Sequence, residues 1–267
     1  MAHLKGLLSL HGTIDGLNFY SIKGNKKTIV RRKPGPTAEQ FKTSKKYERS
    51  RENSCEFAAG SSASAILRHS LLPYSKTIGS SYLSGSLTKE FQKIAMKGDG
   101  LRGKRSIILR QHKEILMGFD LNRNLSLESI LRIKPIVHFN EDRNIVELVL
   151  PEFNPQTDIY APSGATHVEF IHAIAIQPAF TFHFDYNEYR RSDKQNTIIQ
   201  QSILSEKIPL VSEGIFNVSL SLSTPENISI HADSALISAL GIRFYQQVGF
   251  NMFELESGKV MQIVGID

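Results

Sequence analysis

The spacing of the apolar residues changes near Leu131, and this change restricts the folds that the chain can adopt. Before it, apolar residues recur at helical spacing, as in the run from Leu87 to Ala95, which predicts a helix with one buried face. After it they alternate, as strands of a half-buried sheet do; such runs are Val168–Ile176, Phe180–Phe184 and Phe216–Leu222. The chain is therefore predicted to be α+β, with a small N-terminal antiparallel sheet and helices followed by a C-terminal immunoglobulin-like β-sandwich.

The start of the chain predicts a small antiparallel meander within residues 1–33. Asp15-Gly16 is a strong hairpin signal, because both turn residues must accept a positive φ. Gly24-Asn25 predicts a second turn, and Thr28–Val30 predicts a third short strand. Three strands of this length are marginally stable alone, so we expect the sheet to pack on another surface.

A helix is expected after this meander, because Thr37 and Gln40 form a capping-box pattern. Four cations follow at positions i, i+3, i+4 and i+7, which would place them along one helical stripe: Lys42, Lys45, Lys46 and Arg49. These four residues are the candidate interaction surface. A neighbouring acidic stripe consists of Glu48, Glu52 and Glu56, and mixed stripes of this kind are more often a solvated, salt-bridged helix face than a binding site. The small residues of segment 58–65 allow either close helix packing or a flexible joint.

Charge is distributed unevenly along the chain. Residues 1–113 hold 22 Lys and Arg against 7 Asp and Glu, a net +15. Residues 114–267 hold 10 against 19, a net −9, so that the whole chain carries +6. We predict two domains, a basic one over 1–124 and an acidic one over 125–267. The asymmetry indicates an oppositely charged partner, either nucleic acid or the acidic half of another copy, unless two domains simply differ in surface composition.

One segment resembles a phosphate-binding motif. Gly98–Arg105 satisfies G-x-G-x-x-G and falls one residue short of a P-loop, since Arg105 stands where a Mg²⁺-binding Ser or Thr belongs. Both motifs need a preceding strand, whereas the residues before Gly98 have helical spacing. We therefore interpret the segment as a basic, glycine-rich loop between two helices.

The other reactive side chains do not form a recognisable site. The single cysteine, Cys55, excludes an internal disulfide and a cysteine-based zinc site, and its acidic neighbours would raise its pKa. His167 and His172 would point to opposite faces of a strand, and His183 with Asp185 lacks a third ligand. The sequence predicts no catalytic residue, no metal site and no cofactor, and hence a protein that is not an enzyme.

Several short motifs occur between residues 5 and 72. They are Lys5-Gly6, Leu10-x-Gly12-Thr13-Ile14, Phe19-Tyr20, Gly24, Ser50-Arg51-Glu52-Asn53, Glu56-Phe57 and Leu67-Arg68. This pattern resembles that of a family of uncharacterised bacterial proteins, which usually has Thr where this chain has Ser50. A shorter match is Gly241-Ile242-x-Phe244-Tyr245. The resemblance implies a shared architecture, with a short N-terminal sheet and helices before a β-domain, and it implies no activity.

Two functions remain compatible with these observations. The first is a structural or assembly protein that associates with copies of itself, head-to-tail into a ring or a filament. The alternative is nucleic-acid binding by the basic half, where Tyr20, Phe41 and Tyr47 lie among the cations. No apolar run approaches the roughly 20 residues of a membrane span, and no secretory signal is recognised, so a cytoplasmic location is expected. No small-molecule substrate is indicated.

Overall fold

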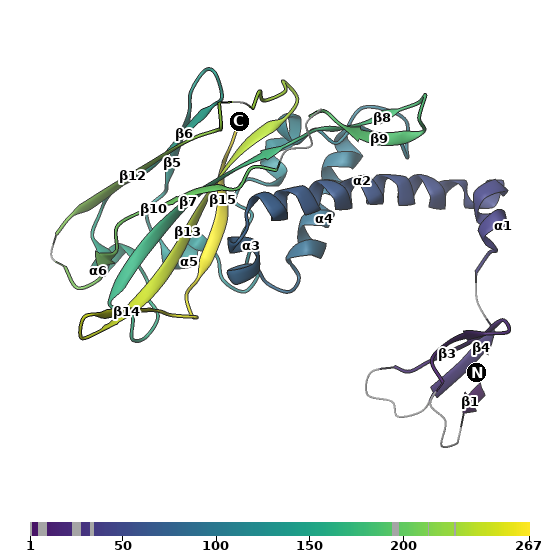
Figure 1. Cartoon of the computed structure of the whole chain (residues 1–267), viewed down its shortest axis with the longest axis horizontal. Helices are drawn as coiled ribbons and strands as arrows, with labels where there is room; N and C mark the ends of the chain where they lie inside the picture. The colour runs from purple at the N-terminus through teal and green to yellow at the C-terminus, as the bar shows by residue number, and fades with distance from the viewer. Residues whose placement is uncertain are drawn as a thin grey trace. The chain divides into compact units, whose positions relative to one another are not determined.

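A computed structural model of the chain describes residues 2–4, 10–22, 28–32, 35–193, 198–212, 214–226 and 228–267 (Figure 1). It divides the chain into two compact units. Unit 1 comprises Met1–Arg51 and unit 2 comprises Glu52–Asp267.

Unit 1 contains a four-stranded antiparallel sheet in the order β1-β4-β3-β2. Its strands are β1 (Ala2–Leu4), β2 (Gly12–Ile14), β3 (Leu17–Tyr20) and β4 (Thr28–Arg32). The hairpin predicted at Asp15-Gly16 is confirmed, with φ values of 46° and 76° at these two residues. The strand predicted from Thr28 is confirmed as β4, while the turn predicted at Gly24-Asn25 lies outside the described residues.

The helices of unit 1 follow the sheet. The predicted capping box is confirmed at the start of α1 (Ala38–Thr43): Gln40 N donates to Thr37 Oγ1 at 3.1 Å, and Thr37 N donates to Gln40 Oε1 at 3.0 Å. A 3₁₀ turn, η1 (Lys45–Tyr47), comes next, and α2 (Glu48–Ser70) begins directly after it.

Unit 2 contains most of α2 and the remaining helices. These are α3 (Tyr74–Thr77), α4 (Leu83–Lys97), η2 (Leu109–Ile115), α5 (Leu127–Ile130) and α6 (Pro155–Asp158). The small residues of segment 58–65 are helical, and Gly60 leaves room for the Gln92 side chain of α4. The apolar face predicted for α4 is confirmed, since its Leu87 and Phe91 are buried. Within the described ranges, no helix is both long enough and apolar enough to cross a membrane.

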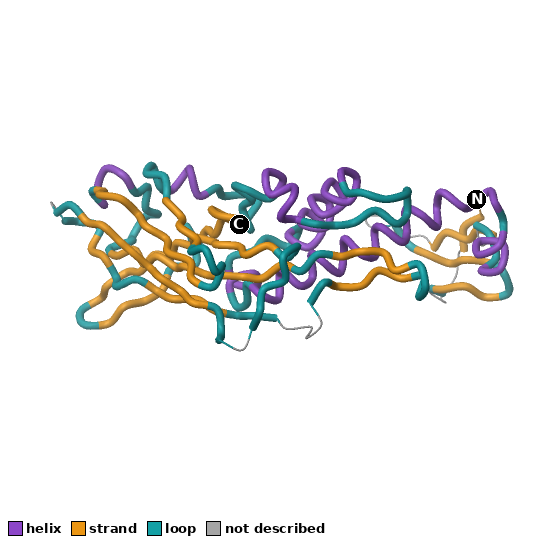
Figure 2. Tube along the Cα trace, turned by 90° about the horizontal axis from the view of Figure 1, so that it is seen from above, coloured by secondary structure: helices purple, strands orange, loops and turns teal. Residues whose placement is uncertain are grey.

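The strands of unit 2 form three sheets, drawn in orange in Figure 2. The large sheet has the strand order β10-β7-β13-β14; in addition, β11 pairs with β7 and β15 pairs with β13. Its strands are β7 (His167–Gln177), β10 (Gln201–Leu204), β11 (Ile208–Pro209), β13 (Ala235–Val248), β14 (Asn251–Glu254) and β15 (Val260–Ile266). The small sheet has the order β12-β6-β5; its strands are β5 (Ile136–Phe139), β6 (Ile145–Phe153) and β12 (Phe216–Ser223). A separate hairpin pairs β8 (Phe180–His183) with β9 (Glu188–Arg191).

The large sheet is buried on both faces. Along β7, Phe170 and Ile174 point to the small sheet, while Ile171 and Ala173 point to the opposite face. That opposite face shares one hydrophobic cluster with α2, α3 and α4, which lie beside the sheet in Figure 1. The helices, the large sheet and the small sheet therefore form three layers, with an apolar core on each side of the large sheet.

The α+β prediction is confirmed, and the immunoglobulin-like form of the sandwich is not confirmed. Helices cover one face of the large sheet, in addition to the strands that cover the other face. The boundary between compact units lies after Arg51, not near residue 124. The physical reason is that the helices between 52 and 97 contribute their apolar side chains to the core of the large sheet.

A buried histidine connects the two sheets. His172 on β7 is fully buried, with Nδ1 2.9 Å from the Leu220 carbonyl of β12 and Nε2 3.0 Å from Ser238 Oγ of β13. Because a carbonyl oxygen only accepts hydrogen bonds, Nδ1 carries the proton and Nε2 accepts from the serine. Burial lowers the pKa of His172 to about 4, although the hydrogen bond to Leu220 opposes this change.

We predict that this histidine makes folding sensitive to acid. The unfolded imidazole titrates near pH 6.5 and the folded one near 4, so stability is lost as the pH falls between these values. The free energy of unfolding should fall by about 3 kcal/mol from this group alone. Urea unfolding of the wild type and of His172→Asn between pH 7 and 4 measures the difference. Equal pH dependence in the two proteins would contradict the prediction.

Candidate interaction surface

The four cations predicted to form one helical stripe lie on three separate elements. Lys42 is in α1, Lys45 and Lys46 are in η1, and Arg49 is in the first turn of α2. All four are exposed, and Lys46 Nζ lies 5.9 Å from the centroid of the Tyr47 ring. The prediction of one continuous stripe is wrong, because Ser44 interrupts the helix.

The interruption at Ser44 is accompanied by contacts from Arg51 in the first turn of α2. Ser44 adopts an extended conformation, with φ −73° and ψ 131°. Its backbone N–H donates to the Gln40 carbonyl, which is the last hydrogen bond of α1. The Arg51 guanidinium then donates to the Phe41 carbonyl at 2.7 Å and to the Ser44 carbonyl at 2.9 Å. These bonds add a partner at the end of α1, where carbonyls lack intrahelical partners; the Ser44 carbonyl also accepts from Tyr47 N at 3.1 Å.

The N-terminal sheet presents an apolar face that the sequence analysis did not single out. Cross-strand pairing places Ile14, Leu17, Phe19 and Val30 on the same side as Arg32. The exposed fractions of Ile14 and Leu17 are 53% and 39%, and Phe19 and Val30 are only half-buried. We call these five residues the N-terminal face. The alternation of β3 and the hairpin at Asp15-Gly16 were the signals that could have identified it.

The opposite side of this sheet is better covered. Ile29 is 4% exposed, and it is the only buried residue within 10–22, 28–32 and 35–51. The guanidinium carbon of Arg31 lies 4.9 Å from the centroid of the Tyr20 ring on the same side. Strands β2, β3 and β4 thus bury one side chain, and sheets of such short strands are marginally stable alone.

The two units carry opposite net charges. Unit 1 has 12 Lys and Arg against 3 Asp and Glu, a net +9, and unit 2 has 20 against 23, a net −3. Among the described residues of unit 1, no cation is paired with a carboxylate. In unit 2, by contrast, cations such as Arg105, Arg191 and Arg243 each have a carboxylate partner.

The glycine-rich loop between 98 and 105 is held by an internal carboxylate. Glu56 Oε1 accepts from Gly103 N and from Arg105 Nε, and its Oε2 accepts from Arg105 Nη2, all at 2.8 Å. Glu56 is 4% exposed, so its predicted place on a solvated stripe is wrong. Burial alone would raise its pKa, but the hydrogen bonds from Arg105 and Gly103 outweigh burial and hold the pKa below its usual value.

The other cation of this loop is also engaged. Lys104 Nζ lies 4.8 Å from the ring centroid of Phe182 and 4.6 Å from that of Phe184, both from the β8–β9 hairpin region. Tyr189 on β9 donates its hydroxyl to the Arg105 carbonyl at 2.8 Å. In a P-loop, the groups of this loop would face a phosphate. Here Arg105 binds Glu56 of α2, and Arg105 and Lys104 both contact the β8–β9 hairpin region.

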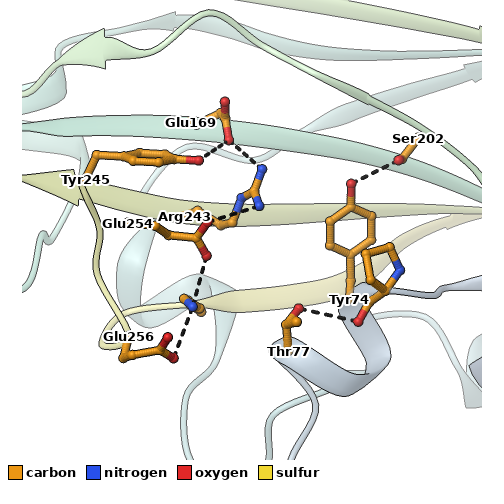
Figure 3. A network of polar contacts seen from close by, with 10 residues as sticks. Tyr74, Thr77, Glu169, Ser202, Arg243, Tyr245, Glu254 and Glu256 are labelled. Atoms are coloured by element: carbon orange, nitrogen blue, oxygen red, sulfur yellow. Dashed lines mark hydrogen bonds and ion pairs between the residues drawn. The ribbon is translucent and has the colours of Figure 1, made fainter. Parts of the chain in front are cut away.

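A second charged network lies on the large sheet (Figure 3). Glu169 accepts from Arg243 at 2.7 Å and from the Tyr245 hydroxyl at 2.8 Å, and burial followed by this hydrogen bond raises the pKa of Tyr245. Arg243 also contacts Glu254 at 3.3 Å, and Lys259 contacts Glu254 at 2.9 Å. Each carboxylate therefore has a cation beside it. Arg243 on β13 links Glu169 on β7 to Glu254 on β14, so the network joins these three strands.

Cys55, the single cysteine, lies on α2 beside Glu56. Burial, followed by the charge of Glu56, raises the pKa of the Cys55 thiol, which confirms the predicted direction and makes it a poor nucleophile. No three His, Cys, Asp or Glu residues in these ranges lie close enough together to hold a metal ion. Comparison of the chain with models of protein families, with curated proteins and with solved structures found no match.

We predict that Glu56 matters for stability far more than its neighbour on the helix. Glu56→Gln leaves Arg105 with a poorer partner in a largely buried place and should lower the free energy of unfolding by about 2–3 kcal/mol. Glu52→Gln is the matched control, because Glu52 is more exposed and lies 3.6 Å from Arg102; it should cost under about 1 kcal/mol. Chemical denaturation at pH 7 compares the two variants, and equal losses would contradict the prediction.

The engagement of the loop also leads us to predict that it does not bind nucleotides. Gly103 and Arg105 already bind the Glu56 carboxylate, and a phosphate would have to displace it. Isothermal titration with ATP or GTP and Mg²⁺ should give no saturable heat. Saturable binding that is lost in Lys104→Ala would contradict this prediction.

Proposed function

We propose that this protein is a non-enzymatic structural or assembly protein that associates with copies of itself. The observation that supports this most strongly is the uncovered N-terminal face, where Ile14 and Leu17 remain exposed. Burying apolar surface is worth about 25 cal/mol per Å², so a sheet with almost no core gains substantially from a partner surface.

Charge favours another copy as that partner. Unit 1 carries +9 and unit 2 carries −3, so unlike units attract while two copies of unit 1 repel. Exposed ion pairs contribute about 0–1 kcal/mol each, so charge would orient the contact while apolar burial supplies most of the affinity. A contact between two different surfaces is heterologous, and its repetition gives a ring if the rotation closes or a filament if it does not.

We expect the purified protein to associate in a concentration-dependent manner. Size-exclusion chromatography with light scattering should detect species larger than the 29.9 kDa chain, before and after nuclease treatment. A wild-type protein that stays monomeric at high concentration and low salt would refute the proposal. Binding to nucleic acid with a steep salt dependence would then become the leading function.

Variants of the N-terminal region should change this association in a graded way. The double variant Ile14→Ser with Leu17→Ser should weaken it by at least about tenfold, through loss of apolar contact. The matched control is Thr13→Ser with Asn18→Ser, on the opposite side of the same hairpin, and it should associate normally.

Reversal of Lys42, Lys45, Lys46 and Arg49 to Glu should weaken association, and deletion of residues 1–33 should abolish it.

A further inference from the structure

The small sheet of unit 2 has an outer face that nothing in the described part of the chain covers fully. Its inner positions, such as Leu148 and Leu220, pack in the core against the large sheet. Alternation along the strands turns Ile136, Ile145 and Val149 outward. The exposed fractions of Ile136 and Ile145 are 45% and 43%, and Val149 is half-buried.

This outer face is acidic and contains no cation. The strands β5, β6 and β12 carry no Lys or Arg. Glu147 lies between Ile145 and Val149 on β6, and its Oε1 accepts a hydrogen bond from Ser219 of β12 at 2.8 Å. Pairing places Glu147 opposite His138 on one side and Ser221 on the other, so no neighbour in the sheet supplies a permanent positive charge.

We propose that this outer face receives the N-terminal face of a second copy. Each surface is a short antiparallel sheet that presents branched apolar side chains beside a charge; on the outer face these apolar side chains lie on β5 and β6, while β12 turns serines outward. The charges are opposite, Arg32 on the N-terminal face and Glu147 on the outer face. Two sheets pack face to face about 10 Å apart, a spacing at which long side chains from both sheets meet.

The inference rests on the proposed function and specifies its contact. It joins unit 1 of one copy to unit 2 of the next, as a heterologous, repeating association requires. The contact places Arg32 beside Glu147, and two like charges at these positions would be disfavoured. Reversing one of the two charges therefore weakens the contact, and reversing both restores it.

The test uses full-length variants in sedimentation velocity at about 0.1 M salt. Arg32→Glu and Glu147→Arg are each expected to raise the dissociation constant for self-association by at least about tenfold. An equimolar mixture of the two single variants is expected to associate as the wild type does, because each surface then meets its complement on the other protein. The double variant in one chain is expected to do the same.

Matched controls separate the specific contact from a change in net charge. Arg31→Glu makes the same charge change as Arg32→Glu but lies on the side of Tyr20, away from the N-terminal face. Glu128→Arg makes the same change as Glu147→Arg but lies on α5. Both controls are expected to associate within about threefold of the wild type. Recovery in the mixture shows that the single variants are folded.

The outcomes distinguish this inference from the proposed function. If the wild type associates and Glu147→Arg associates equally well, the outer face is not the receiving surface and the proposed function stands. If both single variants are weakened but their mixture is not restored, the pairing of Arg32 with Glu147 is refuted. If the wild type does not associate at all, the proposed function and this inference both fail.

Discussion

The antiparallel pairing of β7 with β13 is the constraint on which the rest of unit 2 depends. The two strands pair from His167 to Gln177 and from Tyr245 back to Ala235, and both faces of this ribbon are buried. The face toward the small sheet carries large side chains such as Phe170 and Phe244. The face toward the helices is made largely of alanines. Small side chains on this face let the helices approach closely, and the small residues of α2 serve the same purpose.

Buried charge in this protein is used to join elements that are far apart in the chain. Glu56 on α2 holds the loop at Gly103 and Arg105, and Glu169 on β7 holds Arg243. Each carboxylate is compensated by a cation and by further hydrogen bonds, which is the condition for burying such groups without a large loss of stability. The carboxylates of Glu56 and Glu169 are therefore engaged in contacts within the fold.

The N-terminal sheet contrasts with the large sheet of unit 2. The large sheet has a core on each face, whereas the N-terminal sheet leaves Ile14 and Leu17 exposed. Its strong positive charge makes association between two such sheets unfavourable and favours an acidic apolar surface. The outer face combines Glu147 with the exposed apolar side chains of Ile136 and Ile145. The interaction surfaces that we propose are the two sheet faces on which apolar side chains remain exposed.

Local patterns in the sequence determined the elements, and only the tertiary structure decided what they contact. Asp15-Gly16 specifies its hairpin and Thr37 with Gln40 specifies a helix start, because their conformations depend on residues at most three positions apart. The helix break at Ser44 and the burial of Glu56 depend instead on side chains that reach from elsewhere, the latter from Arg105, 49 residues away. Alternation in β7 likewise predicted one buried face, while the second became buried because helices pack on it. Periodicity records which side of an element is apolar, but the identity of the partner is set by long-range packing.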